Sequence, residues 1–311
     1  MEKKTEIDKV NGVKAWLLAA RPKTLTGAIA PVLVGGALAA ASFSWVLFAL
    51  CLLFAVVMQI DANFVNDYFD FTHGTDRQDR LGPERACAQG WVTPSAMKLA
   101  IIITTIAACV VGLGIVAITH QWELIVVGVA CVVGCFIYTT HLSYMGWGDV
   151  LVVVFFGLVP VGFTYYVITG GDFSLPTLLA GLGMGFATDN LLMVNNYRDV
   201  EQDRISGKRT LIVRFGRRFG LNAYLWLGIV ATIMAVATIL SICHASLQAP
   251  RVSIISALLP LVYLAFHVFT YTAMKRMQGR ALNQVLGRTA LCIFLYGVLL
   301  ASAITLCISV K

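Results

Sequence analysis

The sequence predicts an all-α integral membrane protein, with about nine transmembrane helices around a central cavity. Hydrophobic residues make up 59% of the 311 positions and charged residues only 13%. Apolar runs long enough to cross a bilayer as helix, about 20 residues each, recur along the whole chain. A soluble domain would carry about a quarter charged residues. We therefore expect a single polytopic domain over residues 1–311.

Nine apolar runs mark the expected spans. They cover residues 24–42, 44–64, 96–118, 122–140, 149–169, 176–195, 221–243, 252–273 and 290–309.

Residues 1–22 differ from these runs because lysines alternate with apolar residues. Lys3, Lys4, Lys9 and Lys14 accompany an amphipathic stretch, and no uncharged signal-peptide core is present. Such a segment is typical of a helix that lies on the membrane surface. We expect it on the cytoplasmic side.

The cations indicate the orientation of the chain. When loops are assigned alternately to the two sides of the membrane, all of the 23 Lys and Arg residues except Arg251 and Lys311 fall on one side. By the positive-inside rule, the N-terminus and the loops at 65–98 and 196–220 are cytoplasmic and the C-terminus is outside. The net charge of +7 is then a topology signal suited to the bilayer, and no nucleic-acid partner is expected.

The eight cysteines suggest no special chemistry. Seven lie in the expected spans and Cys87 lies in a loop, without metal-ligand spacing or a disulfide framework.

Two acidic segments end the second and sixth spans at the same predicted membrane face. Asn66–Asp70 (NDYFD) matches Asn195–Asp199 (NNYRD) at three of five positions with a constant offset of 129. On a helix, Asn63, Asn66 and Asp70 share one face, and so do Asn195, Asp199 and Asp203. A duplicated four-helix unit, plus one further helix, would place these two stripes across a shared cavity.

Oxygen ligands without His or Cys favour Mg²⁺, which proteins usually share with substrate phosphates. We expect two such ions to bridge a diphosphate. Helix caps and the topology rule explain single residues of this kind equally well, but paired acidic stripes in a membrane are costly and favour function. The predicted metal ligands are Asn66, Asp70, Asp76, Asn195, Asp199 and Asp203.

With these motifs the chain resembles the UbiA superfamily of intramembrane aromatic prenyltransferases. The resemblance runs from about residue 18 to 216, and within the superfamily it is nearest to the branch that prenylates 1,4-dihydroxy-2-naphthoate. The segments that carry it are Arg21–Leu25, Asn63–Asp70 with Gly74 and Asp76, Gln89 and Gly90 with Pro94, and Asn195–Thr210.

The resemblance implies a cytoplasmic active-site mouth in a bacterial inner membrane. It implies Mg²⁺-dependent transfer of a polyprenyl group from its diphosphate to the naphthoate, with loss of CO₂, in menaquinone biosynthesis. The residues expected to act in catalysis are Asp67, as a base or supporting group, Asp70, Asp199, Arg198 and Lys208. Those expected to bind substrates are Lys23, Asn63, Arg209, Tyr68, Tyr138, Tyr144, Asp149 and Tyr197, with the tyrosine rings facing a developing cation or the acceptor.

Three positions depart from the pattern of the superfamily. Gly74 replaces a third Asp, for which Asp76 is the expected substitute, Tyr138–Tyr144 replaces a Gly-Gly-Pro-like turn, and Asp61 replaces a neutral residue. The acceptor therefore stays open, with 4-hydroxybenzoate, homogentisate or a glycerol-derived alcohol as alternatives. A cation-coupled transporter is a third reading, although its site would lie near the midplane. A CDP-alcohol phosphotransferase is disfavoured, because the Asp-rich signature of that enzyme class is absent from the sequence. Chain length of the isoprenoid and oligomeric state are not predicted.

Overall fold

The computed structural model describes residues 12–74, 80–246 and 250–309, and every regular element in these ranges is helical. Eight helices or continuous helical segments are long and apolar enough to cross a bilayer. A ninth candidate is the pair 12–24 and 26–38, bent by 50° at its junction. The predicted fold class and number of spans are confirmed.

The main helices follow the expected order along the chain. They are α1 (Gly12–Ala20), α2 (Thr26–Leu38), α3 (Trp45–Thr72), α4 (Pro94–Thr119), α5 (Leu124–Ile137), α6 (Ser143–Met145), α7 (Gly148–Val153), α8 (Val159–Thr169), α9 (Leu175–Ile205), α10 (Leu211–Ser246), α11 (Pro250–Arg276) and α12 (Leu282–Ser309).

Several helix ends differ from the predicted spans. Helix α3 continues to Thr72 and α9 to Ile205, whereas the apolar runs end at 64 and 195. Helix α2 is shorter than its predicted span, because a 3₁₀ turn at Ala40–Ser42 follows it. Hydropathy marks only the part of a helix that lies in hydrocarbon. The helical backbone hydrogen bonds can continue beyond that part into polar sequence. Both acidic motifs are consequently helical.

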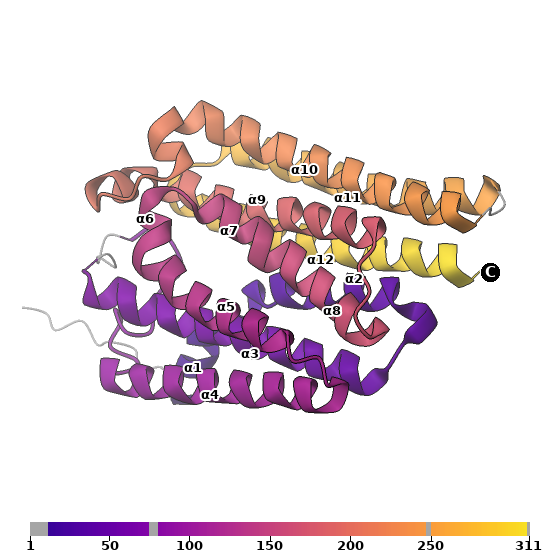
Figure 1. Cartoon of the computed structure of the whole chain (residues 1–311). Helices are drawn as coiled ribbons and strands as arrows, with labels where there is room; N and C mark the ends of the chain where they lie inside the picture. Colours follow the sequence, from indigo (N-terminus) through magenta and orange to yellow (C-terminus); the bar gives the residue numbers. More distant parts are fainter. Residues whose placement is uncertain (1–11, 75–79, 247–249, 310–311) are drawn as a thin grey trace, which may run out of the picture.

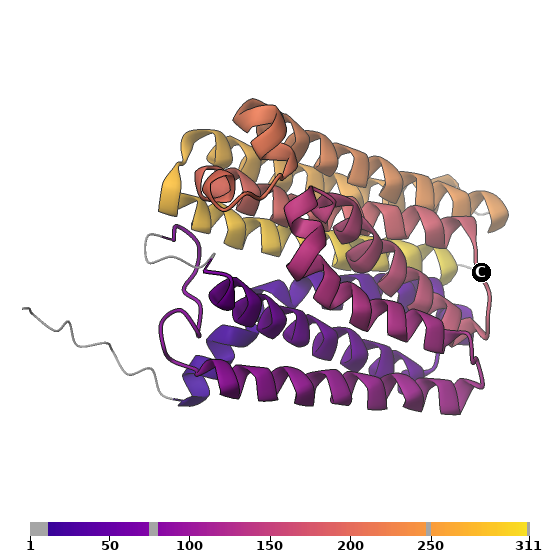
Figure 2. The same ribbon diagram turned by 60° about the vertical axis from the view of Figure 1, so that its left-hand side comes forward.

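The helices run side by side as one bundle (Figures 1 and 2). Helix α3 packs along α4 and α9 along α10, so each acidic helix pairs with the next long helix in the chain. Helix α2 packs against α12 and α8. In Figure 1, α6 lies at one end of the bundle and the C-terminus at the other.

The fifth span approaches α9 through glycines. Helix α7 passes into α8 through a π-helical turn, Val154–Leu158. A Cβ atom on Gly157 would lie 2.3 Å from the carbonyl oxygen of Gly181, and one on Gly185 would lie 2.7 Å from that of Val153. Small residues allow this close backbone contact, which places the end of α7 and the π-helical turn beside α9.

Helix α1 is the described part of the predicted surface segment, since residues 1–11 lie outside the described residues. Ala15 and Ala19 are buried, while Val13 and Leu17 are exposed. The Trp16 ring packs edge-on against Phe64 of α3. The helix thus has one face on the bundle and an apolar face directed outward, as an interfacial helix requires.

Candidate functional site

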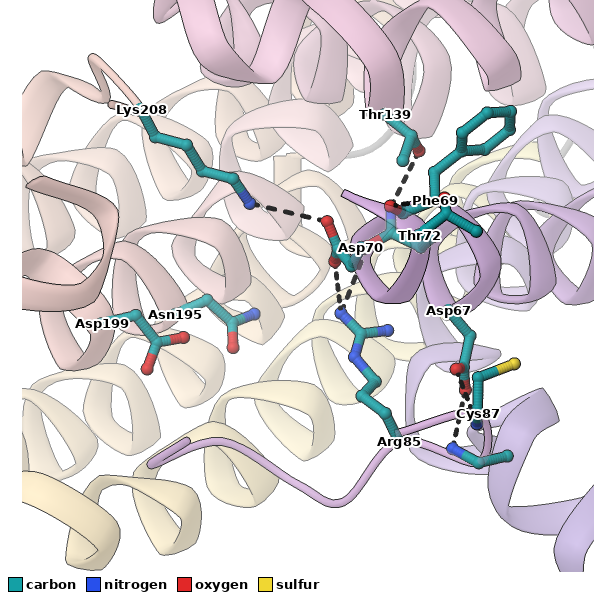
Figure 3. A network of polar contacts seen from close by, with 12 residues as sticks. Asp67, Phe69, Asp70, Thr72, Arg85, Cys87, Thr139, Asn195, Asp199 and Lys208 are labelled. Atoms are coloured by element: carbon teal, nitrogen blue, oxygen red, sulfur yellow. Dashed lines mark hydrogen bonds and ion pairs between the residues drawn. The ribbon is translucent and has the colours of Figure 1, made fainter. Parts of the chain in front are cut away.

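The two acidic stripes line one large cavity at the α6 end of the bundle. Its volume is about 1590 Å³. From α3 it is lined by Asn63, Asn66 and Asp70, and from α9 by Asn195, Asp199 and Asp203. The predicted helix faces therefore meet across a common space. In Figure 3, Asn195 and Asp199 lie on the far side of this space from Asp70.

Asp70 is paired with cations from two other parts of the chain. Its Oδ2 accepts a hydrogen bond from Arg85 Nη2 at 3.1 Å, and Lys208 Nζ lies 3.8 Å from its Oδ1. Figure 3 shows both cations approaching the carboxylate. One helical turn earlier, Asn66 accepts from Arg85 at 3.3 Å and donates to Thr139 at 3.0 Å. Arg85 thus joins the two oxygen donors of the first stripe.

Arg198 organises the second stripe. Its Nε and Nη2 bind the two carboxylate oxygens of Asp199 at 2.8 and 2.6 Å, and Nη2 also donates to Asn195 Oδ1 at 3.0 Å. Only 1% of the Arg198 side chain is exposed. Such a fork on a carboxylate is strong and fixes its direction. Arg198, expected among the catalytic residues, thus neutralises and orients the oxygen donors of its own stripe.

Arg80 lies in the electrostatic field of both stripes. Burial lowers the pKa of its guanidinium, and the carboxylates of Asp199 and Asp70 oppose that shift. The acids are therefore balanced by arginines and a lysine gathered at the same end of the cavity. Clusters of acids at this depth need such compensation.

Asp67, expected as a base or a supporting group, binds backbone N–H groups of a neighbouring loop. Its carboxylate oxygens accept the backbone N–H groups of Ala86 at 2.9 Å and Cys87 at 3.1 Å, and it does not line the cavity. The carboxylate holds a loop rather than facing a substrate. This position fits the expected supporting group rather than a base.

Tyr68 and Tyr197 also lie outside the cavity lining. Tyr68 packs beside Phe69 and lines a separate apolar groove with Phe136, while Arg217 covers the Tyr197 ring at 5.3 Å. Each tyrosine is two residues away from a cavity-facing oxygen donor, which turns it about 200° around the helix. The structure does not bring these two rings to the cavity, where they were expected to face a developing cation or the acceptor.

The other predicted substrate residues divide into two groups. Lys23, Asn63, Tyr138, Tyr144 and Asp149 line the cavity, whereas Arg209 is exposed and does not. Asn63 also ties α3 to the end of α1 and the 3₁₀ turn that follows it, because it donates to Ala20 O at 2.8 Å and to Thr24 Oγ1 at 3.0 Å. Asp76 lies outside the described residues.

The acceptor candidates sit next to further buried acid. Asp149 Oδ1 and Asp189 Oδ1 are buried and have no hydrogen-bond partner among the described residues. Tyr138 reaches the same place, since its hydroxyl would lie 3.9 Å from a Cβ on Gly148. An intramembrane acid of this kind is a functional candidate. Asp189 escaped the sequence analysis because it belongs to neither motif.

The sequence also gave no role to Arg80, Arg85 and Asn283. The first two lie in the 65–98 loop, where cations were interpreted as topology signals, and Asn283 belongs to a helix beyond the recognised motifs. Arg21 entered the sequence analysis only as the first residue of the Arg21–Leu25 motif. Its guanidinium lines the cavity, and Nη2 is buried without a partner among the described residues. Its backbone is left-handed at φ 49°, which is unusual for a non-glycine residue and common at functional sites.

Beyond the polar end, the cavity continues as an apolar arm toward the opposite end of the bundle. Val32, Phe54, Val116, Leu124 and Phe163 belong to this wall, contributed by five helices. A space of this shape accepts a molecule with a charged head and a long hydrocarbon tail.

The donor set suits Mg²⁺ only in a shared site. Among the described residues, no three His, Cys, Asp or Glu side chains are grouped closely enough to hold a metal ion. The cavity instead offers single carboxylates with neighbouring amide oxygens. Mg²⁺ keeps several waters and commonly uses one or two carboxylates plus substrate phosphates. The residues present therefore fit a magnesium ion that arrives with a diphosphate.

A polytopic helical bundle with two acidic stripes facing one amphipathic cavity defines an intramembrane enzyme for a lipid diphosphate. Residues 28–276 match the model of the UbiA prenyltransferase family, and the chain belongs to that family.

Two bacterial relatives are similar to this chain over most of their length. A 1,4-dihydroxy-2-naphthoate octaprenyltransferase from Mycobacterium leprae is 33% identical over 304 residues, which cover 95% of this chain and 97% of that protein. One from Haemophilus influenzae is 36% identical over 216 residues, covering 66% and 70% of the two chains.

Solved structures share the fold at low identity. An apo UbiA homolog from Aeropyrum pernix K1 has a TM-score of 0.68 and 14% identity, with 91% of this chain and 98% of that chain covered. A UbiA homolog from Archaeoglobus fulgidus bound to GPP and Mg²⁺ has a TM-score of 0.61 and 15% identity, covering 93% and 99%.

Proposed function

We propose that this prenyltransferase transfers a polyprenyl group from its diphosphate to 1,4-dihydroxy-2-naphthoate, with loss of CO₂ and with Mg²⁺ as cofactor. The product would be the prenylated 1,4-dihydroxynaphthalene, demethylmenaquinol, which gives demethylmenaquinone of menaquinone biosynthesis when it is oxidised by two electrons. The observation that carries the proposal is the single cavity in which two stripes of oxygen donors and several cations form one end and an apolar arm forms the rest. The names of the relatives supply the acceptor.

The magnesium sites would use the acids and amides that face each other across the cavity. We assign Asn66 and Asp70 on α3, and Asn195, Asp199 and Asp203 on α9. The bound ions would neutralise charge on the diphosphate as its bond to the prenyl carbon breaks.

The cations of the chain would hold the same diphosphate. Lys208 and Arg85 already lie at Asp70, and Arg21 has a buried nitrogen free to donate among the described residues. Lys23 stands at the mouth of the cavity. Fixed cations in a site shielded from water stabilise the leaving group more strongly than they would in solution.

The proposed bond changes need no base. The ring carbon that bears the carboxylate forms a bond to the prenyl carbon, the carbon–oxygen bond to diphosphate breaks, and CO₂ leaves its electron pair in the ring. No ring proton is lost. This agrees with Asp67, whose carboxylate is occupied by backbone N–H groups.

The acceptor would lie between the diphosphate and the start of α7. Tyr138, Tyr144 and Asp149 line this part of the cavity, and Lys208 lies 5.2 Å above the Tyr144 ring. Tyrosine hydroxyls and a cation are suited to the hydroxyl and carboxylate groups of the naphthoate. The isoprenoid tail would follow the apolar arm.

We assign the protein to a bacterial inner membrane, with the cavity mouth and N-terminus cytoplasmic and the C-terminus outside. The support is the charge asymmetry, since all Lys and Arg residues except Arg251 and Lys311 fall on one predicted side. We regard residues 1–311 as a single domain with an interfacial N-terminal segment.

The alternative acceptor is 4-hydroxybenzoate. An acceptor that keeps its carboxylate must lose a ring proton instead, and Asp149, with one oxygen unpartnered among the described residues, is the base nearest at hand in this cavity. A transporter is disfavoured by the position of the acids at one end of the bundle.

The test is product formation by purified protein in detergent with a polyprenyl diphosphate, Mg²⁺, and the two acceptors in parallel. We expect prenylated naphthoquinol from the naphthoate alone, detected as the quinone after oxidation by air, and none after chelation or in Asp70→Ala and Asp199→Ala. Asp172→Ala, an exposed acid far along the chain from both motifs, is the matched control. Product from 4-hydroxybenzoate alone would replace the acceptor, and turnover that survives both substitutions would refute the site. Diphosphate-independent flux into vesicles would favour transport.

A further inference from the structure

Asn283 joins three parts of the chain near the acidic stripes, although it belongs to neither motif. It lies at the start of α12, and its Nδ2 donates to the carbonyl oxygen of Leu81 at 2.9 Å. Its Oδ1 accepts from Arg198 Nη1 at 2.8 Å. The amide has one orientation here, because a carbonyl only accepts and a guanidinium only donates.

The arginine that Asn283 holds is the one that directs the second stripe. Three nitrogens of Arg198 are engaged, with Asp199, Asn195 and Asn283 as their partners. The Arg198 side chain is buried. Asn283 binds its Nη1, the one guanidinium nitrogen that makes no hydrogen bond to Asn195 or Asp199. Asn283 therefore acts on Asp199 through Arg198.

The loop that Asn283 holds, residues 80–91, is also fixed at its other end. Asp67 of α3 accepts the N–H groups of Ala86 and Cys87. Between the two attachments, Arg85 reaches Asp70. The loop thus spans from α3 to α12 with its arginine directed at the first stripe.

The loop lies directly on Arg198 at Gly82. A Cβ atom at this position would be 2.7 Å from Arg198 Nη2 and 3.1 Å from Arg80 Nε. This contact is independent of the amide of Asn283. The backbone of the loop at Gly82 is therefore packed against the Arg198 guanidinium with no room for a side chain.

We propose that Asn283 is a positioning residue, which clasps the 80–91 loop to Arg198 so that Arg85 and Asp199 face the same diphosphate. The clasp is a property of the fold, and its effect on turnover rests on the proposed function. Asn283 touches no reacting atom. Its loss should therefore weaken binding of the diphosphate more than it slows the chemical step.

The direct readout is trypsin cleavage of the Arg80–Leu81 bond, quantified by mass spectrometry on the full chain in detergent. Cleavage after Arg209, which is exposed, serves as the internal reference. We expect Asn283→Ala to raise the rate at Arg80 roughly tenfold, the size of effect that one lost hydrogen bond gives. Gln284→Ala, the exposed neighbouring residue, should leave it unchanged.

Two further variants separate the parts of the clasp. Asn283→Asp still accepts from Arg198 but cannot donate to Leu81, so it should open the loop as Asn283→Ala does. Gly82→Ala should open it from the opposite side, whereas Gly287→Ala, where nothing lies within 4 Å of an added Cβ, should not. If Asn283→Ala does not fold, Gly82→Ala still tests the contact.

Prenyl transfer gives the second readout. We expect KM for the prenyl diphosphate to rise about tenfold in Asn283→Ala with a smaller change in kcat, as for loss of ground-state binding. Unchanged cleavage at Arg80 in Asn283→Ala and Gly82→Ala overturns the clasp, whatever the activity. Faster cleavage with no transfer by the unsubstituted protein supports the clasp and refutes the proposed function. An equal fall in kcat and kcat/KM, with KM unchanged, overturns the positioning role.

Discussion

The Arg198 guanidinium binds both carboxylate oxygens of Asp199, the next residue on the same helix, at 2.8 and 2.6 Å. Neighbours on a helix point about 100° apart, so this pairing requires the long arginine side chain to fold back over the stripe. A carboxylate has about four lone-pair positions, and the arginine fork uses two of them. Asp199 therefore keeps acceptor capacity on the side that faces the cavity.

This pairing predicts that Arg198→Lys is nearly as harmful as Arg198→Ala. Lysine keeps the charge but cannot bind two oxygens in parallel, and its ammonium loses the contacts with Asn195 and Asn283. We expect kcat/KM for prenyl transfer to fall on the order of a hundredfold, about 2.7 kcal/mol. Arg204→Lys, exposed on the same helix and paired with Glu201, is the control and should retain full activity. Full activity of Arg198→Lys would mean that charge alone matters there.

Arg85 provides the second prediction, because it holds Asp70 and Asn66 from a loop rather than from a helix. In Arg85→Ala, the buried carboxylate of Asp70 keeps Lys208, at 3.8 Å, as its ion-pair partner among the described residues. We expect KM for the prenyl diphosphate to rise at least tenfold, and the Mg²⁺ concentration needed for half-maximal activity to change. The measurement is a titration of each at saturating acceptor. Arg218→Ala, exposed at the start of α10, should alter neither; an unchanged Arg85→Ala enzyme would remove Arg85 from the site.

Cys87 allows a prediction about pH. Burial, together with the nearby carboxylate of Asp67, raises the pKa of its thiol to about 12 from an ordinary value of 9.0. At pH 8 only about one thiol in ten thousand is then ionised, so alkylation by iodoacetamide should be at least a hundredfold slower than for an exposed cysteine. Peptide mass spectrometry would follow the reaction at Cys87.

The same shift fixes the direction of a stability effect. Because the pKa in the folded loop is higher than in the open loop, the contribution to loop stability is complete below pH 9 and is lost as pH rises toward 12. The alkylation rate should consequently rise more steeply above pH 9 than thiolate formation alone requires. Rapid alkylation of the folded protein at pH 8 would contradict the buried environment.

The sequence predicted the spans from the length of its apolar runs, and the two oxygen stripes from the helical period. Asn66 and Asp70, like Asn195 and Asp199, are four residues apart, and that spacing places each pair on one face wherever the helix continues. The same geometry turns Tyr68 and Tyr197, each two residues from these donors, away from the cavity, although both were expected to bind substrate.

Other residues were not predictable in this way. Arg85 reaches its partner across 15 positions of chain and Asn283 reaches Arg198 across 85, so only the tertiary fold brings them together. Asp67 is four residues after Asn63, which is the spacing of the first stripe. Its carboxylate nevertheless binds the N–H groups of Ala86 and Cys87 and does not face the cavity. Loop contacts of this kind carry no signal in a single sequence.

Asp61 provides the last prediction, which concerns stability. It is fully buried in α3, away from the cavity lining, and accepts hydrogen bonds from the hydroxyls of Thr104 and Thr105 on α4, the latter at 3.0 Å. Hydrogen bonds between helices in a membrane contribute about 0.6 to 2 kcal/mol each.

Asp61→Ala removes both hydrogen bonds, whereas Asp61→Asn retains an acceptor oxygen for one of them. We therefore expect Asp61→Ala to lower the thermal midpoint in detergent clearly, with Asp61→Asn between it and the unsubstituted protein. In a double-mutant cycle with Thr105→Val, the loss should be less than additive, since the two side chains share one interaction. Strict additivity would show that Asp61 and Thr105 do not stabilise the α3–α4 contact through each other.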